Sequence, residues 1–229
     1  MLKTNHAFGW IESAWGLFIQ QPIKWILLIL IALLISGLTL NLITPFFMAG
    51  VAFACHTQYH GNLLKIQHLF VGFRQALRSL FSLCLIYLVA LIVFYLAIEL
   101  PIRSYIAQHA SASGLFIVLL FACQLLFSVS FLASTLVILN NKTAVEAAKI
   151  AIKIMAGNVR PILMLNFMLS VAIVLMFLLI QQLGIGLLFI TKALFLLWFC
   201  IALILFCSSL YYAYQDLCLK TKLLDDLFC

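Results

Sequence analysis

Long apolar runs alternate with short amphipathic segments along the chain. The clearest amphipathic segment begins at Thr143, which has the capping-box spacing with Glu146, and ends at Gly157. Charged residues recur every three or four positions on one helical face, at Lys142, Glu146, Lys149 and Lys153, whereas mainly alanine and isoleucine occupy the other faces. The chain then enters an uninterrupted apolar run, residues 162–183, of membrane-spanning length. This pattern predicts a short interfacial helix followed by a membrane span.

The same arrangement occurs twice more, so the pattern predicts an all-α, polytopic membrane protein. Each of three repeats contains an interfacial amphipathic helix and a transmembrane hairpin, which gives six transmembrane helices in total. The other two amphipathic segments are residues 10–21 and 65–78, and the predicted spans are residues 26–42, 46–59, 80–100, 115–139, 162–183 and 192–212. We predict a single membrane domain, 1–229, with repeats at 10–60, 65–140 and 143–214 and a short cytoplasmic tail at 215–229.

The composition agrees with a membrane protein. Of the 229 residues, 67% are hydrophobic and 8% are charged, whereas about a quarter of the residues of a soluble domain are charged. The net charge of +7 raises the question of nucleic-acid binding. The cations lie along the edges of apolar runs and do not cluster on a soluble fold, so the sequence predicts no nucleic-acid partner.

The distribution of Lys and Arg predicts the orientation of the chain. The two termini and the loops after the second and fourth spans hold eleven cations, and the opposite side holds two. The eleven are Lys3, Lys24, Lys65, Arg74, Arg78, Lys142, Lys149, Lys153, Arg160, Lys220 and Lys222, and the two are Arg103 and Lys192. Because positive residues concentrate in cytoplasmic loops, both termini are predicted to be cytoplasmic.

Four of these cations, Arg74, Arg78, Lys149 and Lys153, lie on the second and third amphipathic segments. A basic face beside an apolar face is typical of a helix that lies in the headgroup layer. We therefore predict that these four residues contact the headgroups of anionic phospholipids, with the bilayer as the main partner. The alternative is that they only fix the orientation of the chain during insertion.

Three polar residues fall within predicted spans: Gln124, Asn166 and Lys192. A buried amide in hydrocarbon needs a hydrogen-bond partner, so Gln124 and Asn166 are predicted to join helices or to line a polar path. Lys192 lies near the outer end of its span, where its long side chain can extend to the interface.

The nearest approach to a metal-ligand set is Cys55, His56 and His60. His56 and His60 are four residues apart and can face the same way from a helix. No carboxylate lies nearby in the sequence to orient the imidazoles. We therefore predict no metal site and no cofactor, with these three residues as the candidates that a metal would use.

Short motifs resemble a known family: Ala54-Cys55, Gly61, residues 68–73 and residues 147–158. They are similar to those of the BPSS-type bacterial six-helix inner-membrane proteins, and the resemblance extends from Gly9-Trp10 through the sixth span. The layout is also similar to that of YciC-like proteins and of the membrane domain beside some glycerophosphodiester phosphodiesterases. The resemblance implies a location in the inner membrane and no known activity. The phosphodiesterase domain has no counterpart in this chain, so its activity is not expected.

No nucleophile with a neighbouring base, no pair of catalytic carboxylates and no glycine-rich phosphate loop is recognisable in the sequence. We therefore predict that the protein is not an enzyme. The leading hypothesis is an accessory or scaffold protein of the cell envelope, for which a second membrane protein is a further class of partner. The alternative is a transporter of a lipid or small molecule, because repeated helical units often surround a site at the midplane of the bilayer.

Overall fold

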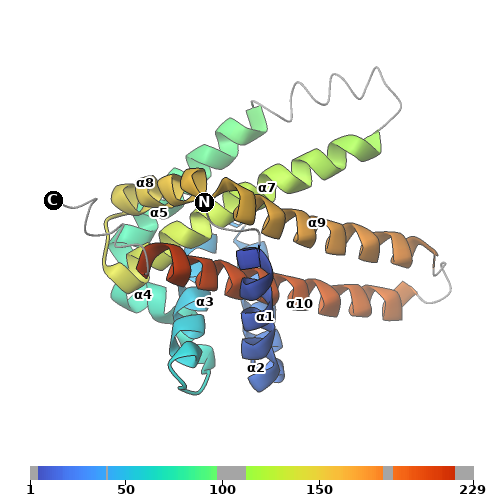
Figure 1. Ribbon diagram of the computed structural model, residues 1–229, viewed down its shortest axis with the longest axis horizontal. Helices are drawn as coiled ribbons and strands as arrows, with labels where there is room; N and C mark the ends of the chain where they lie inside the picture. The colour runs from blue at the N-terminus through green and yellow to red at the C-terminus, as the bar shows by residue number, and fades with distance from the viewer. Residues whose placement is uncertain (1–4, 40, 97–111, 183–187, 220–229) are drawn as a thin grey trace.

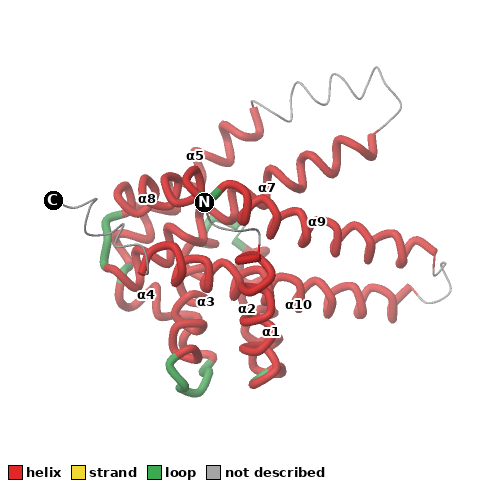
Figure 2. The backbone as a smooth tube through the Cα atoms, in the orientation of Figure 1, coloured by secondary structure: helices red, strands yellow, loops and turns green. Residues whose placement is uncertain are grey.

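The computed structural model describes residues 5–39, 41–96, 112–182 and 188–219. Within these ranges the chain forms helices joined by short loops and contains no strand (Figure 2). In chain order the elements are α1 (Asn5–Gln20), α2 (Pro22–Leu38), α3 (Thr44–Tyr59), the 3-10 helix η1 (Ile66–Phe70), α4 (Val71–Gln75), α5 (Leu77–Phe94), α7 (Ala112–Asn140), α8 (Ala144–Gly157), α9 (Val159–Gln182), α10 (Leu188–Tyr214) and the π-helical turn η4 (Gln215–Leu219). The prediction of an all-α protein is therefore confirmed for the described chain.

Several of these helices are suited to a membrane. Three segments are long and apolar enough to cross a bilayer: Leu77–Phe94, Phe121–Asn140 and Ala193–Leu217. Two bent pairs, α1 with α2 and α8 with α9, raise the number to five if each pair forms one span. Over the described ranges there are thus three to five candidate spans, whereas the sequence analysis predicted six.

The difference from six concerns mainly α3, the second predicted span. This helix has 16 residues and is about 24 Å long at 1.5 Å per residue, whereas the hydrocarbon core is roughly 30 Å thick. Figure 1 shows α7, α9 and α10 roughly along the long axis of the molecule, α5 oblique to it and α3 across it. Most residues of α3 are buried among other helices and do not face outward. The apolar character of α3 therefore reflects the protein core, which the composition of a short segment cannot distinguish from a membrane span.

Two sharp bends separate amphipathic helices from the apolar helices that follow them. The axes of α1 and α2 differ by 101°, and those of α8 and α9 by 91°. Pro22 is the first residue of α2, and its ring and missing N–H prevent the α1 helix from continuing. The predicted capping box of α8 is present, with reciprocal bonds between Thr143 and Glu146, and α8 ends at Gly157 as predicted.

The second amphipathic segment differs from the prediction. Residues 65–78 do not form one helix but divide into η1, α4 and the first turn of α5, with a break at Ala76. The backbone at Leu69 lies directly on α3, where a Cβ added at Gly50 would overlap the carbonyl oxygen of Leu69. This close contact between distant parts of the chain determines the local path and overrides the helical periodicity of the segment.

Helices α3, α7 and α10 contact one another and form the centre of the packing. Each amphipathic element covers one of them: α1 packs on α10, η1 on α3, and α8 on α7. The remaining helices lie between neighbours, with α2 against α10 and α3, α5 against α3 and α7, and α9 against α7 and α10. Every amphipathic element therefore buries its apolar face against a central helix.

Candidate functional site

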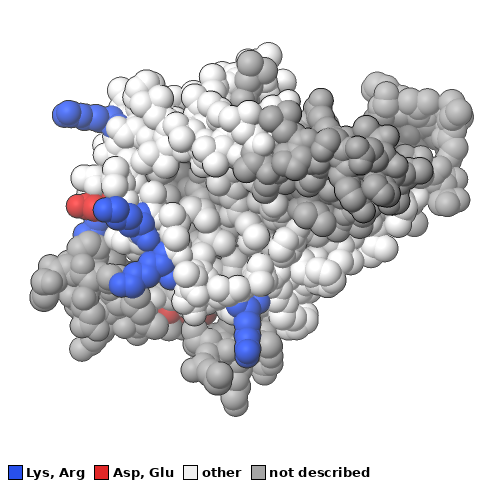
Figure 3. All heavy atoms as spheres, turned by 90° about the horizontal axis from the view of Figure 1, so that it is seen from above, with Lys and Arg blue, Asp and Glu red and all other residues white. Residues whose placement is uncertain are grey.

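The four cations predicted to contact lipid are all exposed, and they lie at one end of the molecule. Arg74 and Arg78 come from α4 and the start of α5, and Lys149 and Lys153 come from α8. Helices α5 and α8 contact each other, so the two groups belong to neighbouring elements. In Figure 3 the visible Lys and Arg side chains gather toward the end where Figure 1 places α4 and α8. This end of the molecule is called the basic end below.

The exposed surface of α8 combines charge with apolar area. Lys149 and Lys153 are exposed beside Val145 and Ile152, which are 54% and 58% exposed. The opposite face of α8, which includes Ala147, is buried against α7. A helix that is fixed to a bundle on one side and mixes cations with aliphatic side chains on the other matches the headgroup boundary, where both kinds of group are accommodated.

Helix α1 contains no Lys or Arg, and its exposed surface includes large apolar side chains. Trp10 is buried, and its Nε1 donates a hydrogen bond to Asp216 Oδ2 at 2.7 Å. Trp15 is 47% exposed, and Phe8 and Ile19 are each 54% exposed. Helix α1 therefore presents apolar side chains on both its buried and its open side. One of these sides packs against α10, and the other is open.

The predicted bonding role of Gln124 and Asn166 agrees with the structure. Ser170 Oγ on α9 lies 2.8 Å from Gln124 Oε1 on α7, and Ser128 Oγ on α7 lies 3.3 Å from Asn166 Oδ1 on α9. All four side chains are buried, so these bonds join α7 to α9. The sequence analysis missed both serines. On α7 Ser128 follows Gln124 by four residues, and on α9 Ser170 follows Asn166 by four residues. Residues four apart share a helical face, so this spacing could have identified the two serines.

Two polar residues remain to be placed. Lys192 lies near the start of α10, but its side chain falls outside the described part of the structure. Gln58, which the sequence analysis did not consider, is buried and joins three elements. Trp25 Nε1 donates to Gln58 Oε1 at 2.7 Å, and Gln58 Nε2 donates to the carbonyl oxygen of Leu17 at 2.8 Å. Gln58 of α3 therefore holds α1 and α2 together at their bend.

The structure keeps His56 and His60 together, with ring centroids 4.3 Å apart, but directs Cys55 into the core. Cys55 is completely buried, and its Sγ lies 3.7 Å from Ser208 Oγ in the core. His56 Nδ1 lies 2.9 Å from the hydroxyl of Tyr211, and His60 Nδ1 donates to the carbonyl oxygen of His56 at 2.8 Å. Among the described residues there is no group of three or more His, Cys, Asp or Glu side chains suited to a metal ion. The Nδ1 atoms of His56 and His60 are thus both directed toward protein oxygens.

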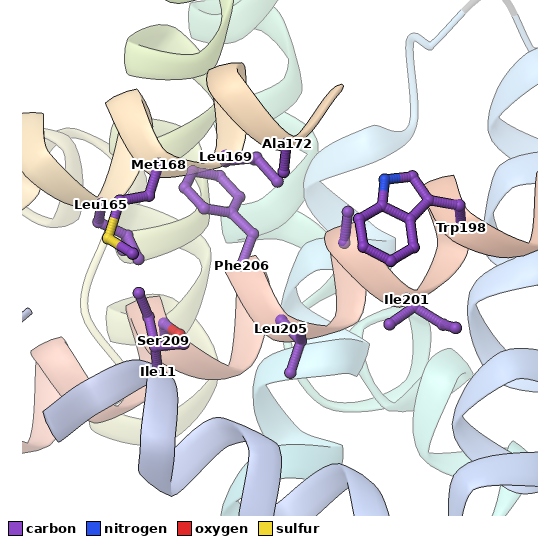
Figure 4. A pocket seen from close by; sticks show the side chains of 11 residues that line it. Ile11, Leu165, Met168, Leu169, Ala172, Trp198, Ile201, Leu205, Phe206 and Ser209 are labelled. Carbon is purple, nitrogen blue, oxygen red and sulfur yellow. The ribbon is translucent and has the colours of Figure 1, made fainter. Parts of the chain in front are cut away.

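A cavity of about 190 Å³ lies between α1, α9 and α10 (Figure 4). Its lining consists of Ile11, Leu165, Met168, Leu169, Ala172, Trp198, Ile201, Ala202, Leu205, Phe206 and Ser209. A second cavity of about 540 Å³ lies between α7 and α9 and is lined by apolar side chains and Ser170. Both cavities suit an apolar ligand and lack the charged groups that bind an ion or a polar solute.

Comparisons with protein-family models, with curated proteins and with solved structures found no match. The resemblance to six-helix inner-membrane proteins therefore stays a prediction, and the functional argument rests on the geometry of this chain.

Proposed function

We propose that this protein is an integral protein of the bacterial inner membrane that acts as a non-enzymatic scaffold or accessory protein and contacts anionic phospholipids. The observation that carries the proposal is the position of Arg74, Arg78, Lys149 and Lys153, exposed at the basic end of a bundle of apolar helices. In the orientation that we propose, α5, α7, α9 and α10 cross the bilayer, and both termini lie on the cytoplasmic side.

The proposed architecture keeps the three repeats, with residues 10–60, 65–140 and 143–214 as units. The packing supports this division, because the amphipathic element of each unit covers the last helix of the preceding unit. Helix α1 closes the series by covering α10. Three units arranged around a common centre would produce these three contacts of α1 with α10, η1 with α3 and α8 with α7.

A scaffold is favoured over a transporter of polar solutes because the cavity between α1, α9 and α10 and the cavity between α7 and α9 are lined almost entirely by apolar side chains. Transport of an ion or polar solute needs charged or polar groups along its path. The buried amides Gln124 and Asn166 bond α7 to α9, which supports a structural role for them.

The expected energy of the lipid contact is modest. A basic side chain near an anionic membrane surface gains about 1 kcal/mol, so four such residues contribute at most about 4 kcal/mol. Screening by salt and by the nearby Glu146 lowers this sum. If screening leaves about 1 kcal/mol of this sum, the preference for anionic lipid is about fivefold, because 1.4 kcal/mol corresponds to a tenfold change in binding.

The test compares two quadruple variants. In the first, Arg74, Arg78, Lys149 and Lys153 are each replaced by glutamine, and in the second the arginines become lysines and the lysines become arginines. Both are purified from membranes, and the ratio of bound anionic to zwitterionic phospholipid is measured by mass spectrometry. We expect at least a fivefold lower ratio in the glutamine variant and an unchanged ratio in the charge-preserving variant. Equal ratios in the parent and the glutamine variant, with unchanged topology, would refute the proposal.

A further inference from the structure

The cavity between α1, α9 and α10 is a groove with two different ends. Figure 4 shows Trp198 at one end and Ile11 and Ser209 at the other, with the ring of Phe206 and aliphatic side chains between them. Ser209 is fully buried, and its Oγ has no hydrogen-bond partner. Apart from the indole of Trp198, Ser209 is the one side chain in this lining that carries a nitrogen or oxygen atom. The groove therefore combines a long apolar wall with one unpaired hydroxyl at its closed end.

The length of the groove matches one leaflet of a bilayer. Trp198 and Ser209 are both on α10, and eleven steps at about 1.5 Å per residue separate them by roughly 16 Å. Half of a hydrocarbon core of about 30 Å is about 15 Å. Ser209 lies within about two turns of Tyr214, the last residue of α10, which ends at the basic end of the molecule. The closed end thus lies at the depth where the glycerol esters of a phospholipid are found, and Trp198 lies near the midplane.

The open side of the groove faces hydrocarbon in the proposed orientation. Trp198 is 41% exposed, and its neighbours Leu194 and Leu197 on α10 are also exposed. On α9 the groove is lined by Leu165, Met168, Leu169 and Ala172, which are all apolar. An apolar surface of this kind on a membrane helix is covered by lipid tails. Small side chains at Ala172 and Ala202 leave the space that a tail can enter.

We propose that this groove binds one acyl chain of a phospholipid from the cytoplasmic leaflet. The chain runs from Ser209 toward Trp198, and an ester carbonyl oxygen accepts the hydrogen bond that the Ser209 hydroxyl has available. The headgroup of the same lipid then lies at the basic end. This inference rests on the proposed function only for the placement of the molecule in the bilayer, because the groove itself is formed by apolar contacts and does not require the basic residues.

The experiment uses the full-length protein in vesicles of phosphatidylethanolamine and phosphatidylglycerol. Two photoreactive phosphatidylglycerol probes carry a diazirine on the acyl chain, one next to the ester and one near the end of the chain. After illumination, labelled peptides are mapped by mass spectrometry. We expect the first probe to label residues near Leu165 and Ser209 and the second to label residues near Ala172 and Trp198. The reverse order, or labelling spread evenly over the exposed apolar surface, would overturn the proposal.

Variants that fill the groove provide the second arm. Ala202→Phe fills it from α10, and Ala172→Phe fills it from α9, so that the test does not depend on the folding of one variant. The matched control is Ala193→Phe, the same substitution at an exposed position of α10. We expect at least a fivefold loss of groove labelling in the first two variants and none in the control. Unchanged labelling in a folded groove-filling variant would contradict the proposal.

The same vesicles separate this inference from the proposed function. If the groove binds a chain but the basic end does not select anionic lipid, a phosphatidylcholine probe labels the groove as strongly as phosphatidylglycerol does. In that case the proposed anionic-lipid contact fails and the groove stands. If the glutamine variant loses its preference for anionic lipid while Ala202→Phe leaves labelling unchanged, the groove fails and the lipid contact stands.

Discussion

Replacing Gln58 by leucine removes the polar contact that holds the bend between α1 and α2. Gln58 is only 4% exposed, and its side-chain amide bonds both Trp25 and the carbonyl oxygen of Leu17. Leucine fills a similar volume but offers neither a donor nor an acceptor. The variant therefore removes the partner of the fully buried indole N–H of Trp25. It also removes the side-chain donor to the carbonyl oxygen of Leu17, in the last turn of α1.

The magnitude follows from the two groups left unpaired. A buried donor or acceptor that loses its partner costs about 1–3 kcal/mol, so the two together predict a loss of about 2–6 kcal/mol in the free energy of unfolding. Trp25→Phe removes the donor and also part of a fully buried ring, and it is expected to cost about 1–3 kcal/mol. Gln58 and Trp25 share one hydrogen bond, so each single variant already includes its loss. The double variant should therefore lose about 1 kcal/mol less in the free energy of unfolding than the sum of the two single losses.

The measurement is reversible unfolding in mixed micelles, followed by far-ultraviolet circular dichroism because the tryptophan content changes between variants. Gln75→Leu is the matched control, since Gln75 is exposed on α4 and its replacement is expected to change the free energy of unfolding by less than about 0.5 kcal/mol. If Gln58→Leu unfolds within about 0.5 kcal/mol of the parent, the bend does not depend on this contact and the reasoning is refuted.

Further predictions concern packing, metal and topology. Gly50→Ala should destabilise the protein by about 1–3 kcal/mol because the new Cβ overlaps the backbone at Leu69. The control Gly16→Ala, on an open face of α1, should be neutral or stabilising, and thermal unfolding compares the two variants. His56→Ala/His60→Ala should leave the metal content of the purified protein unchanged, because both Nδ1 atoms already lie at hydrogen-bonding distance from protein oxygens; stoichiometric metal in the parent that this variant loses would show the opposite. Reporter fusions after Lys142 and at the C-terminus should behave as cytoplasmic, because of the positive-inside bias, and a periplasmic C-terminus would reject the orientation.

The sequence by itself determined the helices whose signals are local. The capping box at Thr143 and Glu146 and the end of α8 at Gly157 both occur where the sequence predicted them. Each depends on a side chain and a backbone group within a few residues of each other, so a short window contains the whole cause. The all-helical class and the presence of membrane-suited helices followed in the same way from the composition and length of the apolar runs.

Tertiary structure decided what those runs pack against. The sequence predicted that residues 46–59 cross the membrane, but α3 lies across the longer helices and is buried among them, because an apolar segment satisfies a protein core as well as it satisfies lipid. The break in the second amphipathic segment comes from the contact between Gly50 and Leu69, and the role of Gln58 comes from Trp25, which is distant in sequence. The groove beside Ser209 likewise needs α1, α9 and α10 together. Such contacts depend on how distant helices approach each other, and hydrophobic periodicity along one segment carries no information about its neighbours.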